Sequence, residues 1–80
     1  MNEVEALKEA IRAIDPLRLA WVETQMQVSC QAREVMLRRS GRIGSERKAE
    51  RELIAAEQHK ETAAALRVLV AIVEGEDESI

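Results

Sequence analysis

Apolar residues recur along this chain at the three- and four-residue spacing of an α-helix. The first stripe is narrow and contains Val4, Leu7, Ile11 and Ile14. It predicts a helix over residues 3–14. Pro16 disfavours helical backbone at Asp15 and is itself a favoured first helical residue, with Asp15 as its N-cap. A second helix is therefore predicted over residues 16–39, at an angle to the first.

Residues 40–45 carry the only loop signal in the middle of the chain. Gly41 suits the left-handed position that follows a helix, and Ser45 is a good N-cap for the next one. A third helix is predicted over residues 46–74. Because the loop is short, the second and third helices must run antiparallel, and residues whose numbers sum to roughly 85 lie opposite each other.

Gly75 is expected to end the third helix, which leaves residues 76–80 as an acidic, disordered tail. Residues 1–75 then form a single domain, since a chain of 80 residues is too short for two. The predicted fold class is all-α: a short N-terminal helix followed by a long antiparallel helical hairpin.

The second helix carries two apolar stripes on opposite sides. One stripe contains Leu17, Trp21, Thr24, Val28, Ala32 and Val35. The other contains Leu19, Val22, Met26, Cys30 and Leu37. The two are separated along one flank by Glu23, Gln27, Gln31 and Glu34. We expect the third helix to cover the stripe that holds Trp21, which would make this side chain an anchor of the hairpin or of an oligomer interface.

The second stripe is longer than the first helix can cover, so it needs another chain. Burying a Leu, Val or Met side chain is worth roughly 1.5–3 kcal/mol, which favours self-association. The sequence therefore predicts a homo-oligomer, most simply a dimer, that forms a helical bundle. The same stripe is the candidate surface for a protein partner.

The third helix is expected to change character along its length. Near the loop it is amphipathic, with Ala49, Leu53 and Ala56 facing inward. From Ala63 to Val73 only Arg67 interrupts an apolar run. A helix that is apolar all round is buried all round, so the thick core should lie at the end of the hairpin that holds the termini.

Composition and charge narrow the classes of function. Charged residues make up 34% and hydrophobic residues 46% of the chain, with one aromatic residue and a net charge of −3, which argues against wholesale nucleic-acid binding. A single cysteine permits no intrachain disulfide and fits a reducing compartment, so a cytoplasmic location is expected, without membrane contact. No motif for a cofactor or a metal is present.

Basic residues cluster at the expected tip of the hairpin: Arg38, Arg39, Arg42, Arg47, Lys48 and Arg51. One interpretation is an anion-binding surface, since Arg pairs bidentately with phosphate and the third helix begins here with free N–H groups. The other is a solvated tip, where basic residues are favoured at a helix C-terminus. The lack of Phe and Tyr argues against base stacking.

Three further residues have both a structural and a functional interpretation. His59 is expected to pack on the inward side of the third helix, because one His and one Cys do not make a zinc site. Cys30 is expected to be a small buried hydrophobic residue rather than a nucleophile. Arg67 is expected to pair with Asp15 or Glu23, since a buried Arg must be paired. The alternative for Arg67 is an anion site at an oligomer cavity.

We expect this chain to act by binding rather than by catalysis, because no paired carboxylates or nucleophile–base pair can be assigned. The leading hypothesis is a small protein-interaction module, a bacterial or phage-encoded regulator or inhibitor of a host protein. Its general plan is similar to that of phage inhibitors of host proteins and of small RNA-binding plasmid regulators. The alternative is a phosphate-bearing ligand, RNA or a nucleotide, at the Arg-rich tip.

Overall fold

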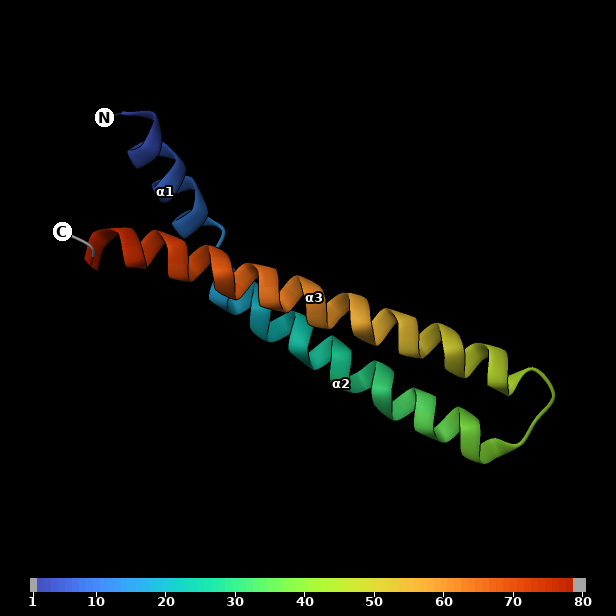
Figure 1. Ribbon diagram of the computed structural model, residues 1–80. Helices are drawn as coiled ribbons and strands as arrows, with labels where there is room; N and C mark the ends of the chain where they lie inside the picture. Colours follow the sequence, from blue (N-terminus) through green and yellow to red (C-terminus); the bar gives the residue numbers. More distant parts are fainter. Residues whose placement is uncertain (1, 79–80) are drawn as a thin grey trace.

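A computed structural model describes residues 2–78, and this part of the chain contains helices and no strand. The three helices are α1 (Glu3–Ala13), α2 (Pro16–Ser40) and α3 (Ser45–Glu78). Helices α2 and α3 lie side by side and antiparallel, while α1 stands away from them at the end where both termini lie (Figure 1). The molecule is a rod of 59 × 18 × 14 Å. The all-helical fold and the antiparallel hairpin are confirmed.

The junction between α1 and α2 is built around Asp15. Its backbone is left-handed, with φ 51°, and its carboxylate accepts a hydrogen bond from the Arg18 N–H at 3.4 Å. Pro16 follows as the first residue of α2. Asp is one of the few residues that adopt this conformation at modest cost, so Asp15 turns the chain and caps α2 together.

The loop between α2 and α3 closes with two left-handed glycines, Gly41 and Gly44. Ser45 then starts α3, and its hydroxyl donates to the Arg42 carbonyl oxygen at 2.6 Å. Helix α3 does not end at Gly75, where we expected it to end, but continues to Glu78. A glycine inside a helix costs about 1 kcal/mol and does not force a stop. Of the predicted disordered tail, residues 79–80 lie outside the described part of the chain.

A seam of small residues joins α2 to α3. Its fully buried members are Ala20, Ala49, Ala56 and Ala63, each at most 1% exposed. On α3 the seam residues recur at alternating steps of four and three from Ser45 to Val73, which is the heptad spacing of a two-helix coiled coil. No large side chain of the described residues is fully buried. The helices therefore approach closely along alanine, with little apolar volume between them.

The side of α2 that faces α3 differs from the prediction. Neither apolar stripe fills the seam by itself. Ala20 and two residues of the flank, Glu23 and Gln27, face α3 together with Cys30 of the second stripe. Trp21, expected to face the core, is 62% exposed. Alanine on α3 leaves no room for a large side chain on α2. The polar seam residues Glu23 and Gln27 are only half-buried, so their polar groups are not fully removed from solvent.

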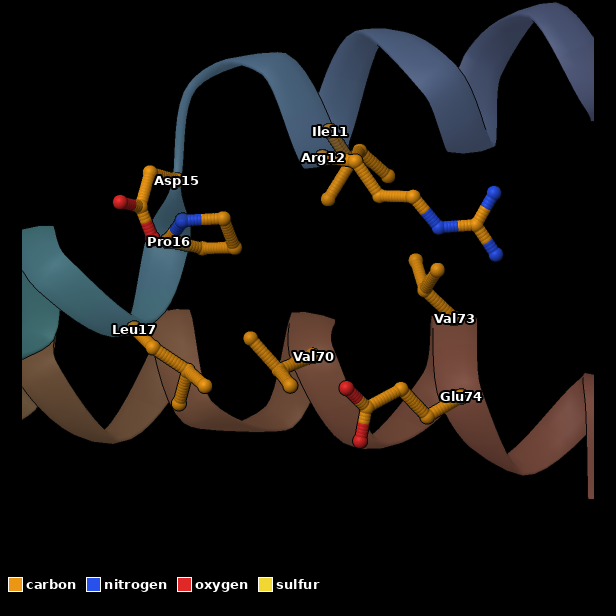
Figure 2. A pocket seen from close by; sticks show the side chains of 8 residues that line it. All are labelled: Ile11, Arg12, Asp15, Pro16, Leu17, Val70, Val73 and Glu74. Atoms are coloured by element: carbon orange, nitrogen blue, oxygen red, sulfur yellow. The ribbon is translucent and has the colours of Figure 1, made fainter.

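The apolar run of α3 is not covered within the chain. Val68, Leu69 and Ile72 remain exposed, so the prediction of burial all round is wrong for the single chain. Helix α1 meets the hairpin at a shallow hollow of about 170 Å³, where Ile11 and Arg12 lie across from Val70 and Val73 (Figure 2). Val68, Leu69 and Ile72 do not line this hollow, so much of the run stays open.

Candidate interaction surface

The seam divides the surface of the hairpin into two long faces. On one of them Arg67 donates to Thr24 Oγ1 at 2.8 Å, and Arg38 reaches Glu46 at 3.0 Å. Helix α1 lies over the terminal end of this face, above Leu17 and Glu74 (Figure 2). We call it the α1 face.

The opposite side, which we call the open face, carries a row of exposed apolar side chains. They are Leu19, Val22, Met26 and Met36 from α2, with Leu69 and Ile72 from α3. On α2 the row follows heptad spacing, one position away from the seam. Large exposed apolar patches are typical of surfaces through which proteins interact, so this row is the candidate interaction surface.

The middle of the open face is hollowed beside Trp21, Val22 and Met26, and His59 forms its floor. The His59 ring nitrogen Nδ1 contacts the Glu23 carboxylate across the seam, with both side chains one-quarter exposed. His59 is thus held by a single carboxylate inside the hairpin, as a packing residue would be. The aromatic and aliphatic side chains above it remain accessible.

Arg38 is taken up by carboxylates at the tip of the hairpin. Its guanidinium contacts Glu34 at 3.0 Å, Glu46 at 3.0 Å and Glu50 at 3.9 Å. The Glu34 hydrogen bond is the main reason why the pKa of Arg38 is raised. Arg38 therefore links α2 to α3 on the α1 face through ion pairs. Few of its N–H donors remain for an external anion.

Three other basic residues come together at the tip, on the open face. Arg42, Lys48 and Arg51 line a wide hollow of about 710 Å³, together with Met36 and the fully exposed Ile43. Arg39 and Arg47, also candidates for an anion surface, do not line it. The hollow is therefore both cationic and apolar, a combination that suits an acidic partner with apolar side chains.

Arg33 lies at the inner edge of this basic hollow and was not among the predicted residues. It contacts Glu52 at 3.2 Å and donates to Cys30 Sγ at 3.3 Å. The hydrogen bond from Arg33 lowers the pKa of Glu52, while burial raises the pKa of the Cys30 thiol. Cys30 is a protonated, buried seam residue, so it belongs to the hairpin interior rather than to the surface stripe in which it was placed.

The predicted surplus stripe combined two neighbouring rows of α2. Leu19, Val22 and Met26 lie on the open face, whereas Cys30 lies in the seam and Leu37 is half-buried beside it. Positions 30 and 37 fall within about 40° of position 26 on a helix of 3.6 residues per turn, so periodicity alone did not separate them. Strict heptad counting from Leu19 leads to Met36 instead.

Arg67 does not pair with Asp15 or Glu23 as expected. It is exposed and donates to Thr24, because Asp15 caps α2 and Glu23 contacts His59. The opposed pairs do follow the expected register: Arg33 meets Glu52, and Glu23 meets His59.

Within the described residues, no cluster of three or more His, Cys, Asp or Glu is arranged to hold a metal ion. The same part of the chain has no helix with the length and apolar character needed to span a membrane. Comparisons of the chain with protein-family models, curated proteins and solved structures find no match. Its function must therefore be inferred from its residues and their geometry.

Proposed function

We propose that this chain is a small protein-interaction module that binds other amphipathic helices along its open face, first of all those of a second copy of itself. The observation that carries the proposal is the distribution of side-chain size in the hairpin. Alanine is buried in the seam, whereas the larger apolar side chains of Val22, Met26 and Leu69 are exposed. Each such side chain gains roughly 1.5–3 kcal/mol when it is buried. A partner helix supplies the burial that the hairpin itself does not.

Size supports the same proposal. A chain of 80 residues buries little apolar surface by itself and is commonly stabilised by association. The dimer would be a helical bundle of two hairpins, and its remaining apolar surface would serve a second protein. We propose a regulator or inhibitor of a host protein as the role of such an assembly, acting in the cytoplasm and without a cofactor.

The test of this proposal is the mass of the protein in solution. We expect sedimentation equilibrium to give a dimer, and the double change Val22→Asn with Met26→Gln to shift it to monomer while circular dichroism remains helical. Ile54→Asn is the matched control, because Ile54 is exposed on α3 at a heptad position directed away from the seam. A wild-type protein that stays monomeric at high micromolar concentration would overturn the self-association.

Binding of a phosphate-bearing ligand is the second candidate function. It is favoured by the basic hollow, where Arg42, Lys48 and Arg51 converge. RNA or a nucleotide bound there would dissociate as salt rises, because its affinity would depend on charge. Replacing all three residues by Ala would abolish such binding. An affinity for RNA that is unchanged by the triple replacement would exclude this site.

A further inference from the structure

The open face consists of two apolar areas that are separated along α2. The larger area lies toward the terminal end and includes Val22, Met26 and Leu69. Farther along α2, Ser29 and Arg33 interrupt the apolar row, and the basic hollow begins at Arg33. The hollow at the loop end is therefore a distinct part of the surface, with its own charge and its own apolar side chains.

The cations of the basic hollow are not balanced by the chain itself. Among the described residues, no carboxylate lies within 4.0 Å of Arg42, Lys48 or Arg51. Glu52 is the only acidic side chain among the described residues that line either hollow of the open face, and Arg33 already holds it. The hollows of a second copy would therefore bring further cations and no free carboxylate, so they do not supply the missing negative charge.

Apolar side chains surround these cations. Ile43 is fully exposed, Met36 is 70% exposed, and Leu37 is half-buried beside them. Inorganic phosphate would pair with the cations but would leave both exposed side chains in water. None of the described residues that line the hollow is aromatic, so a nucleic-acid base has no stacking partner there. A ligand that carries both carboxylates and apolar side chains would cover the whole hollow, and this is the chemistry of a protein segment.

The spacing of the cations suits a helix. Lys48 and Arg51 are three residues apart on α3, which places them about 4.5 Å apart along its axis. Carboxylates three or four residues apart on a partner helix have a matching spacing. Met36 lies on the other side of the hollow, on α2. A helix that carries acidic residues on one side, with large apolar residues next to them, therefore matches the hollow.

We infer that the basic hollow binds an acidic amphipathic helix of another protein. The carboxylates of this helix pair with Arg42, Lys48 and Arg51, and its apolar side chains pack on Met36 and Ile43. This inference rests on the proposed function as an interaction module, and it adds the chemistry of the partner and the part of the surface that the partner occupies. The larger apolar area then remains for the second copy.

A selection from random peptides tests the inference although the partner is unidentified. A phage-displayed library of random peptides of about 15 residues, or four helical turns, would be selected on the immobilised wild-type protein. We expect the recovered peptides to be enriched in Asp and Glu, with large apolar residues at spacings of three and four. A selection that recovers no binder, or only binders without acidic residues, would overturn the inference.

A recovered acidic peptide then serves as the probe for the residues of the hollow. Its affinity, measured by fluorescence anisotropy, should fall at least about tenfold with the double change Lys48→Ala and Arg51→Ala, because two charge pairs are lost. Arg39→Ala with Arg47→Ala is the matched control: it removes the same charge at exposed residues of the tip that do not line the hollow. Equal losses in the two variants would show that net charge attracts the peptide, and would contradict a site in the hollow.

The apolar contribution is tested at the loop. Ile43→Ser should weaken binding of the peptide by about tenfold, because a buried Ile contact is lost. Ile54→Ser makes the same change at an exposed position of α3 outside the hollow and should leave the affinity unchanged. If Ile43→Ser has no effect either, the peptide does not pack on the hollow, and the assignment to an amphipathic helix is wrong.

Measurements of mass keep this inference apart from the proposed self-association. Val22→Asn with Met26→Gln should give a monomer that still binds the acidic peptide, whereas Lys48→Ala with Arg51→Ala should remain a dimer that binds it weakly. A wild-type monomer that binds the peptide would overturn the self-association alone. A wild-type dimer that recovers no acidic peptide would overturn this inference alone. Circular dichroism of each variant establishes that the helices persist.

Other anionic ligands give a distinct outcome. An RNA oligonucleotide and vesicles that contain phosphatidylserine would each be tested as competitors of the acidic peptide. We expect both to compete weakly and to lose this effect as salt rises, because they engage the cations without covering the apolar side chains. Binding of either competitor that is tighter than that of the peptide, and that is lost with Lys48→Ala and Arg51→Ala, would assign the hollow to phosphate groups and overturn the inference.

Discussion

The seam and the open face carry opposite kinds of side chain. In the seam, Ala49, Ala56 and Ala63 are completely buried, and polar groups such as Glu23 stand at the edges. On the open face, Met26 and Ile72 are exposed. Small residues set the spacing of two helices but bury few methylene groups, each worth about 0.8 kcal/mol. The seam therefore specifies the geometry of the hairpin, while most of the large apolar side chains remain exposed on its surface.

This separation implies that the shape of the hairpin and its stability have different sources. The seam selects the pairing of α2 with α3 through close approach and through the contacts of Arg38, Arg33 and His59. In the proposed assembly, further stability comes from the helices that cover the open face. We therefore expect substitutions in the seam to act on the fold of the single chain, and substitutions on the open face to act on association.

Ala56→Leu is expected to have the largest effect on the fold. Ala56 is 1% exposed, and a larger side chain would force α2 and α3 apart at a cost of about 1–3 kcal/mol. The free energy of unfolding in urea measures this loss. Ala32→Leu makes the same change at an exposed position on α2 and should stay within about 0.5 kcal/mol of wild type. Similar losses in both variants would mean that alanine does not set the spacing of the seam.

The glycine that follows α2 and the glycine near the end of α3 differ in their conformational requirements. Gly41 has a φ of 63°, so Gly41→Ala should lower the free energy of unfolding by about 1–2 kcal/mol, although no atom lies within 4 Å of the added methyl group. Gly75 lies inside a helix, and Gly75→Ala should raise helix content and stability by up to about 1 kcal/mol. A loss of stability in Gly75→Ala would place the end of α3 near Gly75 instead.

The elements of the fold follow from local signals, which is why the sequence predicts them. Asp15-Pro16 and Gly41 mark the breaks between helices, and the short loop dictates the antiparallel hairpin. The register also follows, since Arg33 and Glu52 meet where the numbering rule places them. These features depend on local backbone preferences and on loop length, and both can be inferred from a single sequence.

The orientation of α2 in the seam did not follow from the same pattern. Hydrophobicity pointed to Trp21 as the inward residue, yet the inward row contains Ala20, Glu23 and Cys30. The partner helix decides this choice: alanine on α3 accepts small or half-buried polar residues and excludes an indole ring. The candidate anion cluster also differs from the prediction. Arg38 is paired with three carboxylates of the chain itself, including Glu34 and Glu46.

The contact between Glu23 and His59 tests how much the polar positions of the seam contribute. A double-mutant cycle with Glu23→Ala and His59→Ala should give a coupling energy of about 1 kcal/mol, the net value of a hydrogen bond between half-buried groups. A cycle between Glu23→Ala and Glu61→Ala, on the outer side of α3, provides the control and should be additive. If the first cycle were additive as well, the contact between Glu23 and His59 would contribute nothing, and alanine packing alone would stabilise the seam.

The smallest effect is expected from the Arg33–Glu52 pair at the edge of the seam, and its signature is a dependence on pH. The hydrogen bond from Arg33 lowers the pKa of Glu52 below its ordinary 4.5, so the pair stabilises the fold above that pH and loses its contribution as pH falls through the lowered pKa. Glu52→Gln should therefore be less stable than wild type at pH 7 and converge with it in acid. Urea unfolding between pH 7 and pH 2.5 measures this convergence, with Glu61→Gln as the control that shows none. A difference between Glu52→Gln and wild type that stays constant across this range would show that the Glu52 side chain acts through packing rather than through its charge.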